Sequence, residues 1–253
     1  MNTSNVRTFA EKIVSPFTLA FSAFSHLPSL PYQINRVLYH CFHIGYCTFW
    51  IVGILSLFIG GVLALQTGFS LKSVSGAHSF IGSIVGLSMV RELGPMMTAF
   101  LVAGRVGSAT TAELASMQVY NEVDALITMK LSPARILVLP RLVAILLMMP
   151  ILTMFSNILG WFGGMIVSYH VDLISLDPQT YWDGVKTYVD FESVKDGLIK
   201  AETFGFIIVL ICCNVGLHTK GGPREIGTAV TKGVISSMCM ILILDYFVTK
   251  FTL

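Results

Sequence analysis

An arginine and a glutamate stand side by side in one of the most apolar parts of this chain. Residues 91–95 read RELGP and directly follow the apolar run SFIGSIVGLSMV. A charge at the centre of a bilayer costs about 2.5–3.5 kcal/mol on insertion scales, so such residues normally face a bundle interior or a wet cavity. Arg91 and Glu92 are therefore predicted to line a polar cavity, and Pro95 is predicted to kink the helix near residues 89–91.

The chemistry available to this pair is recognition of an anionic group. The planar guanidinium of Arg91 suits a phosphate because it can donate two parallel hydrogen bonds. Glu92 would hold the arginine side chain or counterbalance its charge. An alternative remains, in which residues 79–90 form a shallow re-entrant helix and the pair is structural.

The composition predicts that lipid surrounds most of the chain. Hydrophobic residues make up 54% of the 253 and charged residues only 12%, about half the share of an average soluble domain. The net charge of +2 gives no indication of nucleic-acid binding. A bilayer-spanning helix needs about 20 mainly apolar residues. The predicted fold class is an all-α integral membrane protein with about five transmembrane helices, at residues 45–69, 79–104, 142–169, 198–217 and 233–251.

The distribution of lysine and arginine predicts the orientation. With a cytoplasmic N-terminus, ten basic residues fall inside and five outside, so the C-terminus is expected on the outer side. Residues 1–40 are predicted to form an amphipathic interfacial helix, because Pro16 interrupts the apolar run that a signal peptide would need. Residues 41–253 are predicted to form the transmembrane domain. The outer loop, 170–197, is aromatic and acidic and is predicted to carry a short interfacial helix.

Small residues recur every fourth position after the Arg91–Glu92 pair. Such columns let membrane helices approach closely, either within one subunit or around a homodimer axis, and the sequence leaves both open. One column contains Gly104 and Ser108, and the neighbouring column contains Gly107.

Residues 120–132 are predicted to form a short amphipathic helix on the cytoplasmic side. Glu122 and Asp124 give it an acidic start, Leu126 and Met129 supply apolar surface, and Pro133 is expected to end it. A solvated connector does not need so much apolar surface, so a docking partner is indicated. The dipeptide Gly-Lys is absent from the sequence, which excludes a G-x-x-x-x-G-K-[ST] phosphate loop.

Other polar groups give no sign of catalysis or metal binding. His40 and His43 flank Cys41, but a carboxylate partner is missing nearby, and both histidines are interpreted as interfacial polar residues. Neither a nucleophile–base set nor a metal cluster stands out, so we expect no catalytic residue and no metal site.

Two stretches together resemble a known family. Residues 91–144, which begin RELGPMMTAFLVAGRVGSATTAEL, resemble the signature of the MlaE/YrbE permeases, and residues 200–235 resemble the tail of the same signature. Members are permease subunits of ABC transporters that work on lipids with MCE-domain proteins and maintain outer-membrane lipid asymmetry. The resemblance implies a homodimer in the bacterial inner membrane, a cytoplasmic ATPase docked on residues 120–132, a periplasmic MCE-domain protein and, in some systems, a STAS-domain subunit. It places the lipid cavity at Gln66, Phe69, Arg91 and Glu92.

The hypothesis from sequence is therefore a permease that moves phospholipids between the inner membrane and an MCE-domain partner. This chain is expected to bind no cofactor, because ATP and Mg²⁺ would be used by the ATPase subunit. Two alternatives remain. One is an ion-coupled secondary transporter of hydrophobic solutes that uses Arg91 and Glu92 as a relay, and the other is a membrane scaffold without transport.

Overall fold

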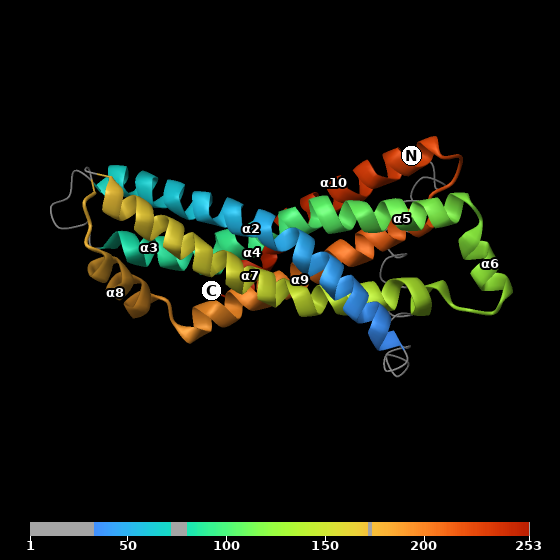
Figure 1. The fold of residues 1–253 in the computed structure, drawn as a ribbon, viewed down its shortest axis with the longest axis horizontal. Helices are drawn as coiled ribbons and strands as arrows, with labels where there is room; N and C mark the ends of the chain where they lie inside the picture. Colours follow the sequence, from blue (N-terminus) through green and yellow to red (C-terminus); the bar gives the residue numbers. More distant parts are fainter. Residues whose placement is uncertain (1–32, 72–79, 172–173, 253) are drawn as a thin grey trace. The chain divides into compact units, whose positions relative to one another are not determined.

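All regular structure in the described part of the chain is helical. The computed structural model describes residues 33–71, 80–171 and 174–252. Along these residues the elements are α2 (Ile34–Leu71), α3 (Ile81–Ser88), η3 (Met89–Leu93), α4 (Gly94–Val102), η4 (Ala103–Gly107), α5 (Ser108–Val119), α6 (Glu122–Thr128), η5 (Ala134–Val138), α7 (Leu139–His170), α8 (Pro178–Tyr188), α9 (Phe191–Leu217) and α10 (Arg224–Thr252) (Figure 1). The elements labelled η are π-helical turns. The predicted all-α fold class is confirmed. Most of the predicted interfacial segment, 1–40, lies outside the described residues, but residues 34–40 form the first turns of α2 and continue directly into the first span.

Within these described residues, five helices are long and apolar enough to cross a membrane. They cover Ile34–Leu71, Ile81–Val119, Ala134–His170, Phe191–Leu217 and Arg224–Thr252. The number agrees with the prediction, but three of the helices extend beyond both ends of the predicted span. A fourth, Phe191–Leu217, begins earlier than predicted and ends at the predicted residue. Hydropathy marks only the membrane-sized apolar part of a helix, whereas backbone hydrogen bonding continues into its polar ends.

The chain forms two compact units, each built from three stretches. Unit 1 comprises Met1–Ile44, Val102–Met148 and Phe204–Leu244, and unit 2 comprises Gly45–Leu101, Met149–Thr203 and Asp245–Leu253. The Arg91–Glu92 pair belongs to unit 2, whereas the small-residue columns and α6 belong to unit 1.

The core of unit 2 forms where α8 packs on α3 (Figure 1). The Asp177 carboxylate accepts a hydrogen bond from the backbone N–H of Gln179 at 3.1 Å, and Pro178 occupies the first turn, so α8 has a well-formed start. Tyr181 is fully buried in this core, and burial raises the pKa of its hydroxyl. The predicted short helix in the outer loop exists, but packing on α3 holds it.

In unit 1, the column that contains Gly107 packs inside the subunit. A Cβ on Gly107 would lie 2.8 Å from the Cys212 sulfur of α9. Thr111, one turn further along, donates a hydrogen bond to the carbonyl oxygen of Gly107 at 2.9 Å. A Cβ on Gly233 of α10 would lie 2.9 Å from the Thr111 hydroxyl, so α10 also packs closely against this column. Gly104 and Ser108, in the other column, are half-buried.

The predicted cytoplasmic helix is α6, which connects α5 to the following span and is shorter than 120–132 (Figure 1). Asn121 before it and Lys130 after it have φ values of 60° and 58°, and these left-handed residues set its ends. The helix therefore ends before Pro133, which was expected to stop it. Val123 is buried and anchors the helix, Leu126 is half-buried, and the exposed predicted coupling residues are Glu122, Asp124 and Met129.

Candidate functional site

The Arg91–Glu92 pair lies in the π-helical turn η3, within one uninterrupted helix from Ile81 to Val119. The chain does not turn back after residue 90, so the re-entrant alternative is wrong. π-Helical turns occur mostly as single bulges inside α-helices, frequently at functional sites. The irregularity lies where the kink was predicted. Pro95 has no backbone N–H, so it cannot donate to the carbonyl oxygen of Arg91 as an ordinary helical residue would.

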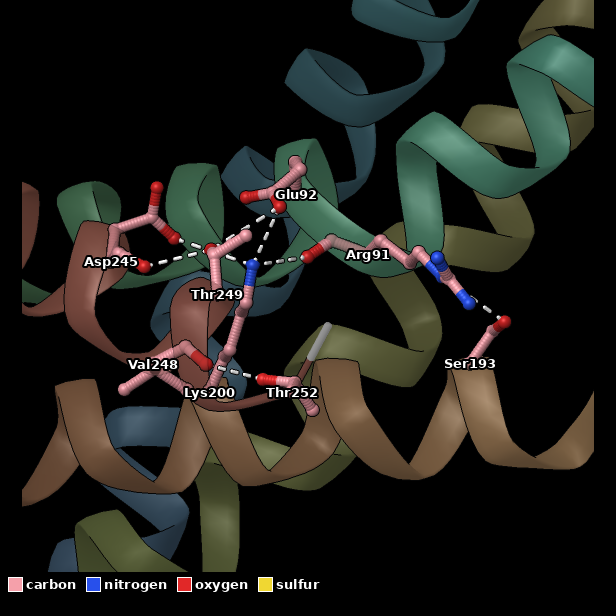
Figure 2. Close-up of polar contacts among 8 residues, drawn as sticks. All are labelled: Arg91, Glu92, Ser193, Lys200, Asp245, Val248, Thr249 and Thr252. Atoms are coloured by element: carbon pink, nitrogen blue, oxygen red, sulfur yellow. Dashed lines mark hydrogen bonds and ion pairs between the residues drawn. The ribbon is translucent and has the colours of Figure 1, made fainter.

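A lysine from another helix satisfies that free carbonyl group. The Nζ atom of Lys200, on α9, donates to the carbonyl oxygen of Arg91 at 3.0 Å and to a carboxylate oxygen of Glu92 at 2.7 Å. The carboxylate of Asp245, on α10, lies 3.6 Å from the same nitrogen. Figure 2 shows the ammonium group between the two carboxylates. The Lys200 side chain is only 3% exposed, and a charge so buried requires partners of this kind.

A glycine on α9 allows this close contact. A Cβ on Gly197 would lie 2.2 Å from the carbonyl oxygen of Val90, in η3. Only a residue without a side chain fits against that backbone. Lys200 follows three positions later and therefore lies on the same face of α9. The sequence thus brings α9 against the π-helical turn and places the lysine beside it.

The side chain of Arg91 points away from this cluster (Figure 2). Its Nε atom donates to the hydroxyl of Ser193 at 3.2 Å, and the side chain is exposed. Glu92 pairs with Lys200 rather than holding the Arg91 guanidinium, as the sequence had suggested it could. The lysine and the two carboxylates therefore hold the π-helical turn, and the arginine remains available at the surface of the pocket.

A pocket of about 320 Å³ lies against this arrangement in unit 2. Its volume falls at the lower end of the roughly 300–1,000 Å³ range typical of small-molecule sites. The lining combines two cations and two carboxylates with hydroxyl groups and one apolar side chain. These residues are Leu87, Ser88, Arg91, Glu92, Asp196, Lys200, Thr249 and Thr252.

The structure does not bring all predicted cavity residues together. Gln66 and Phe69 are exposed on α2, and Phe69 is 63% exposed, but neither belongs to the lining of this pocket. Pro95 is buried, and its ring lies 3.5 Å from the position that a Cβ added to Gly197 would occupy. Its role as the cause of the helix irregularity agrees with the geometry.

Sequence reasoning missed Lys200, Asp245 and Thr249. Lys200 was one of the five basic residues counted as outside, although it lies in the first turn of the predicted span 198–217. Asp245 passed unnoticed in the run ILILDYFV. The available signal was the rule that had identified Arg91, because any ionisable residue inside an apolar span requires a partner. Pairing residues from three different helices, however, requires the tertiary structure.

The chain was also compared with known proteins. The family model described as "Permease MlaE" matches residues 37–251. A probable ABC transporter permease protein of Rickettsia felis is 38% identical over 245 residues, which covers 96% of this chain and 92% of the relative. A probable ABC transporter permease protein of Synechocystis sp. is 35% identical, covering 94% of this chain and 90% of the relative.

A further relative carries a more specific description. The intermembrane phospholipid transport system permease protein MlaE of Haemophilus influenzae is 32% identical over 225 residues, covering 88% of this chain and 82% of the relative. The region that the family model matches, residues 37–251, includes the π-helical turn, the lysine cluster and α6. With a family match across most of its length, this chain belongs to the MlaE permease family.

Proposed function

We propose that this chain is the membrane subunit of an ABC transporter that moves phospholipids between the inner membrane and an MCE-domain partner. The observation that carries the proposal is the exposed Arg91 guanidinium beside a polar pocket in an otherwise apolar bundle. Family membership supports the permease role, and the relative from Haemophilus influenzae supports phospholipid as the substrate.

In this proposal Arg91 binds the lipid phosphate. Its guanidinium is accessible, and Ser193 orients it through the Nε atom, which leaves the terminal nitrogens for an anion. Lys200 acts as a positioning residue because its ammonium group holds the backbone of the turn that carries Arg91. The acyl chains lie along apolar surfaces of the spans, with Gln66 and Phe69 on α2 as further contacts for the lipid.

The partner subunits supply energy and receive the lipid. We infer that a homodimer forms, with the column of Gly104 and Ser108 as one contact surface. The cytoplasmic ATPase docks on α6, where Met129 is 61% and Ile127 56% exposed. The N-terminus is cytoplasmic and the C-terminus periplasmic in this arrangement. ATP and Mg²⁺ act in the ATPase, and a STAS-domain protein is a further candidate subunit.

The test of the site uses the reconstituted transporter. Arg91→Ala removes the phosphate contact, so we expect at least a tenfold loss of ATP-dependent transfer of a fluorescent phospholipid from proteoliposomes to the MCE-domain partner, which corresponds to about 1.4 kcal/mol. Arg91→Lys keeps the charge without the planar fork and should retain part of the transfer. The matched control is Lys195→Ala, an exposed cation on α9 outside the pocket.

The same assay separates the alternatives. Transfer by Arg91→Ala equal to that of Lys195→Ala would remove the headgroup role. Transport that follows an imposed proton gradient and needs no ATPase would instead favour an ion-coupled secondary transporter. A chain that supports no transfer under any condition, although folded and assembled, would fit a scaffold.

The docking of the ATPase has its own test. Asp124→Lys reverses a charge on the exposed face of α6, so the ATPase should co-purify with the permease in reduced amount. Asp183→Lys makes the same change on an exposed position of α8, in the outer loop, and should retain the ATPase. Equal recovery of the ATPase with both variants would contradict the assignment of α6.

A further inference from the structure

Three buried polar groups of unit 2 have no hydrogen-bond partner among the residues that the structure describes. They are the hydroxyls of Thr98, on α4, and Thr153, on α7, and the amide oxygen of Asn157, also on α7. Thr98 and Thr153 are fully buried, and Asn157 is 2% exposed. All three residues lie near the middle of a membrane-crossing helix, away from bulk water. Native structures rarely leave such groups unpaired, so they indicate a partner of another kind.

Contacts between α7 and the helix that contains η3 fix their relative direction. The Nε1 atom of Trp161, on α7, donates to the carbonyl oxygen of Gly86, on α3, at 3.3 Å. One position earlier on α7, a Cβ added to Gly160 would overlap the side chain of Met89, in η3. Moving back along α7 therefore corresponds to moving forward from α3 into η3, and these parts of unit 2 run antiparallel.

The same register brings the three polar groups together. A Cβ added to Gly94, the first residue of α4, would overlap the amide oxygen of Asn157, so these two residues are in contact. One helical turn further back on α7 is Thr153, and one turn further forward on α4 is Thr98. The two threonines therefore face each other across the helix contact, one turn from the contact of Asn157 with Gly94.

The hydroxyls of Thr98 and Thr153 differ from those of other threonines in the chain. Thr67, Thr111 and Thr249 each donate to a carbonyl oxygen one turn earlier in their own helix, at 2.7–2.9 Å. This bond is a common way for a threonine inside a helix to satisfy its hydroxyl. Within the described residues, Thr98 and Thr153 make no such bond, and neither is exposed. Their hydroxyls are therefore available to a partner held between α4 and α7.

A water molecule suits these groups better than an ion does. Buried waters typically make about three hydrogen bonds to polar groups that would otherwise be unpaired. A hydroxyl can donate or accept and the amide oxygen accepts, so one water can bond to all three groups. If the Asn157 amide rotates and its nitrogen takes the place of the oxygen, a water can accept instead, whereas a cation cannot bind there. None of the three groups carries a charge that would compensate a buried ion.

We propose that Thr98, Thr153 and Asn157 bind an ordered water molecule between α4 and α7. Its hydrogen bonds join α7 to the segment that directly follows η3, as polar contacts between membrane helices do. None of the three residues lines the pocket at Arg91, so this is a separate site. The proposal goes beyond the transport function and holds whether or not Arg91 contacts the transported lipid.

The first test detects the water in the purified full-length protein, in detergent micelles equilibrated with H₂¹⁸O. X-ray radiolysis converts a bound water into a hydroxyl radical, which oxidises the nearest side chain and leaves ¹⁸O in the product. Met89 reports on this site because it is 1% exposed and its carbonyl oxygen lies beside Gly94. We expect ¹⁸O in Met89 of the wild-type protein and a several-fold loss in the Thr98→Val/Thr153→Val double variant. Unfolding would expose Met89 and increase the label, so a misfolded variant cannot produce the expected loss.

The second test measures the thermal unfolding midpoint of the single variants in the same micelles. If a water satisfies the hydroxyls, Thr98→Val and Thr153→Val each lose a hydrogen bond, and the midpoint should fall by about 2–4 °C. The matched control, Thr67→Val on α2, removes a buried hydroxyl that the backbone of Leu63 satisfies and should cause a similar fall. Hydroxyls without any partner would give the opposite sign, because valine then removes an unpaired polar group.

The outcomes separate a water site from a dry contact and from an ion site. Label in Met89 that depends on the two threonines, together with lower midpoints, identifies the water. Wild-type Met89 without ¹⁸O, or higher midpoints for both threonine variants, would show a dry contact and overturn the proposal. Exchange of choline chloride for sodium chloride should leave the wild-type midpoint unchanged. A rise with sodium that Asn157→Leu abolishes would identify a cation instead and would also overturn the proposal.

Discussion

Two arginines of the same long helix lie in π-helical turns beside polar pockets, but the two pockets are built differently. Arg91 belongs to η3 in unit 2, and Arg105 belongs to η4 in unit 1. In each pocket a second, buried cation is held by a carboxylate, with Lys200 2.7 Å from Glu92 and Arg141 2.6 Å from Glu113. Each pocket therefore has one buried cation paired with a carboxylate, Lys200 or Arg141, and one arginine from a π-helical turn in its lining, Arg91 or Arg105.

The differences lie in the charge balance and in the burial of the carboxylates. The lysine of the first pocket has two carboxylate partners, Glu92 and Asp245, and the lining contains Asp196 as a further acidic residue, so cations are not in excess. The second pocket has one carboxylate for two arginines, and this carboxylate is 59% exposed. The first arrangement stabilises the backbone that presents Arg91, whereas the second holds the buried Arg141 against a carboxylate that remains exposed.

The largest expected effect on stability comes from replacing the two buried cations, Lys200 and Arg141. Lys200→Met leaves Glu92 and Asp245, whose side chains are 40% and 22% exposed, without their buried partner. We expect a loss of free energy of unfolding that approaches but does not exceed the about 3–5 kcal/mol for a fully buried pair. Arg141→Met leaves Glu113 largely in contact with solvent, so its cost should be about 1–2 kcal/mol. Unfolding in detergent micelles measures both values, and equal losses would show that the two pairs contribute in the same way.

The next effect concerns the glycines beside the two turns. Gly197→Ala places a Cβ 2.2 Å from the backbone oxygen of Val90, and we expect overpacking to cost about 1–3 kcal/mol. Gly107→Ala meets the sulfur of Cys212 at 2.8 Å, and this side chain can move, so the loss should be smaller.

The control for both glycine variants is Gly227→Ala on α10, where a Cβ would meet open space. This change should stabilise the helix by up to about 1 kcal/mol. Unfolding in the same micelles ranks the three variants. A Gly197→Ala protein as stable as the Gly227→Ala protein would mean that α9 does not need to approach the turn so closely.

A smaller effect on stability is expected from Pro95→Ala. The alanine restores a backbone donor that can bond to the carbonyl oxygen of Arg91 in place of Lys200, so the free energy of unfolding should change by no more than about 1 kcal/mol. Lipid transfer should nevertheless fall several-fold, because the turn relaxes and Arg91 is redirected. Unchanged transfer would indicate that the lysine cluster, and not the proline, maintains η3.

The smallest expected effect concerns the hydroxyl next to Glu92. Thr249 donates to this carboxylate at 3.4 Å, a long hydrogen bond, and also to the carbonyl oxygen of Asp245 at 2.7 Å. Thr249→Val should therefore cost only about 0.5–1 kcal/mol, near the low end for an intramolecular hydrogen bond. A loss as large as that of Lys200→Met would show that the threonine is a full member of the cluster.

The sequence by itself determined the number of apolar helices, the position of the irregular turn and the amphipathic helix near residue 125. Each of these depends on local chemistry. A long apolar run can satisfy its backbone only as a helix in lipid, Pro95 lacks a donor wherever it occurs, and Asn121 tolerates a left-handed conformation. Arg91 and Glu92 were found because ionisable residues stand out in such surroundings.

Only the tertiary structure decided which charges meet. It pairs Glu92 with Lys200 from a helix more than a hundred residues away, adds Asp245 from a third helix, and directs Arg91 to Ser193 instead. It also gathers His40, Arg105 and Arg141 around one pocket. Ion pairing depends on distances of a few ångströms between helices, and those distances are set by close contacts such as that of Gly197 with Val90, which leave no periodic signal in the sequence.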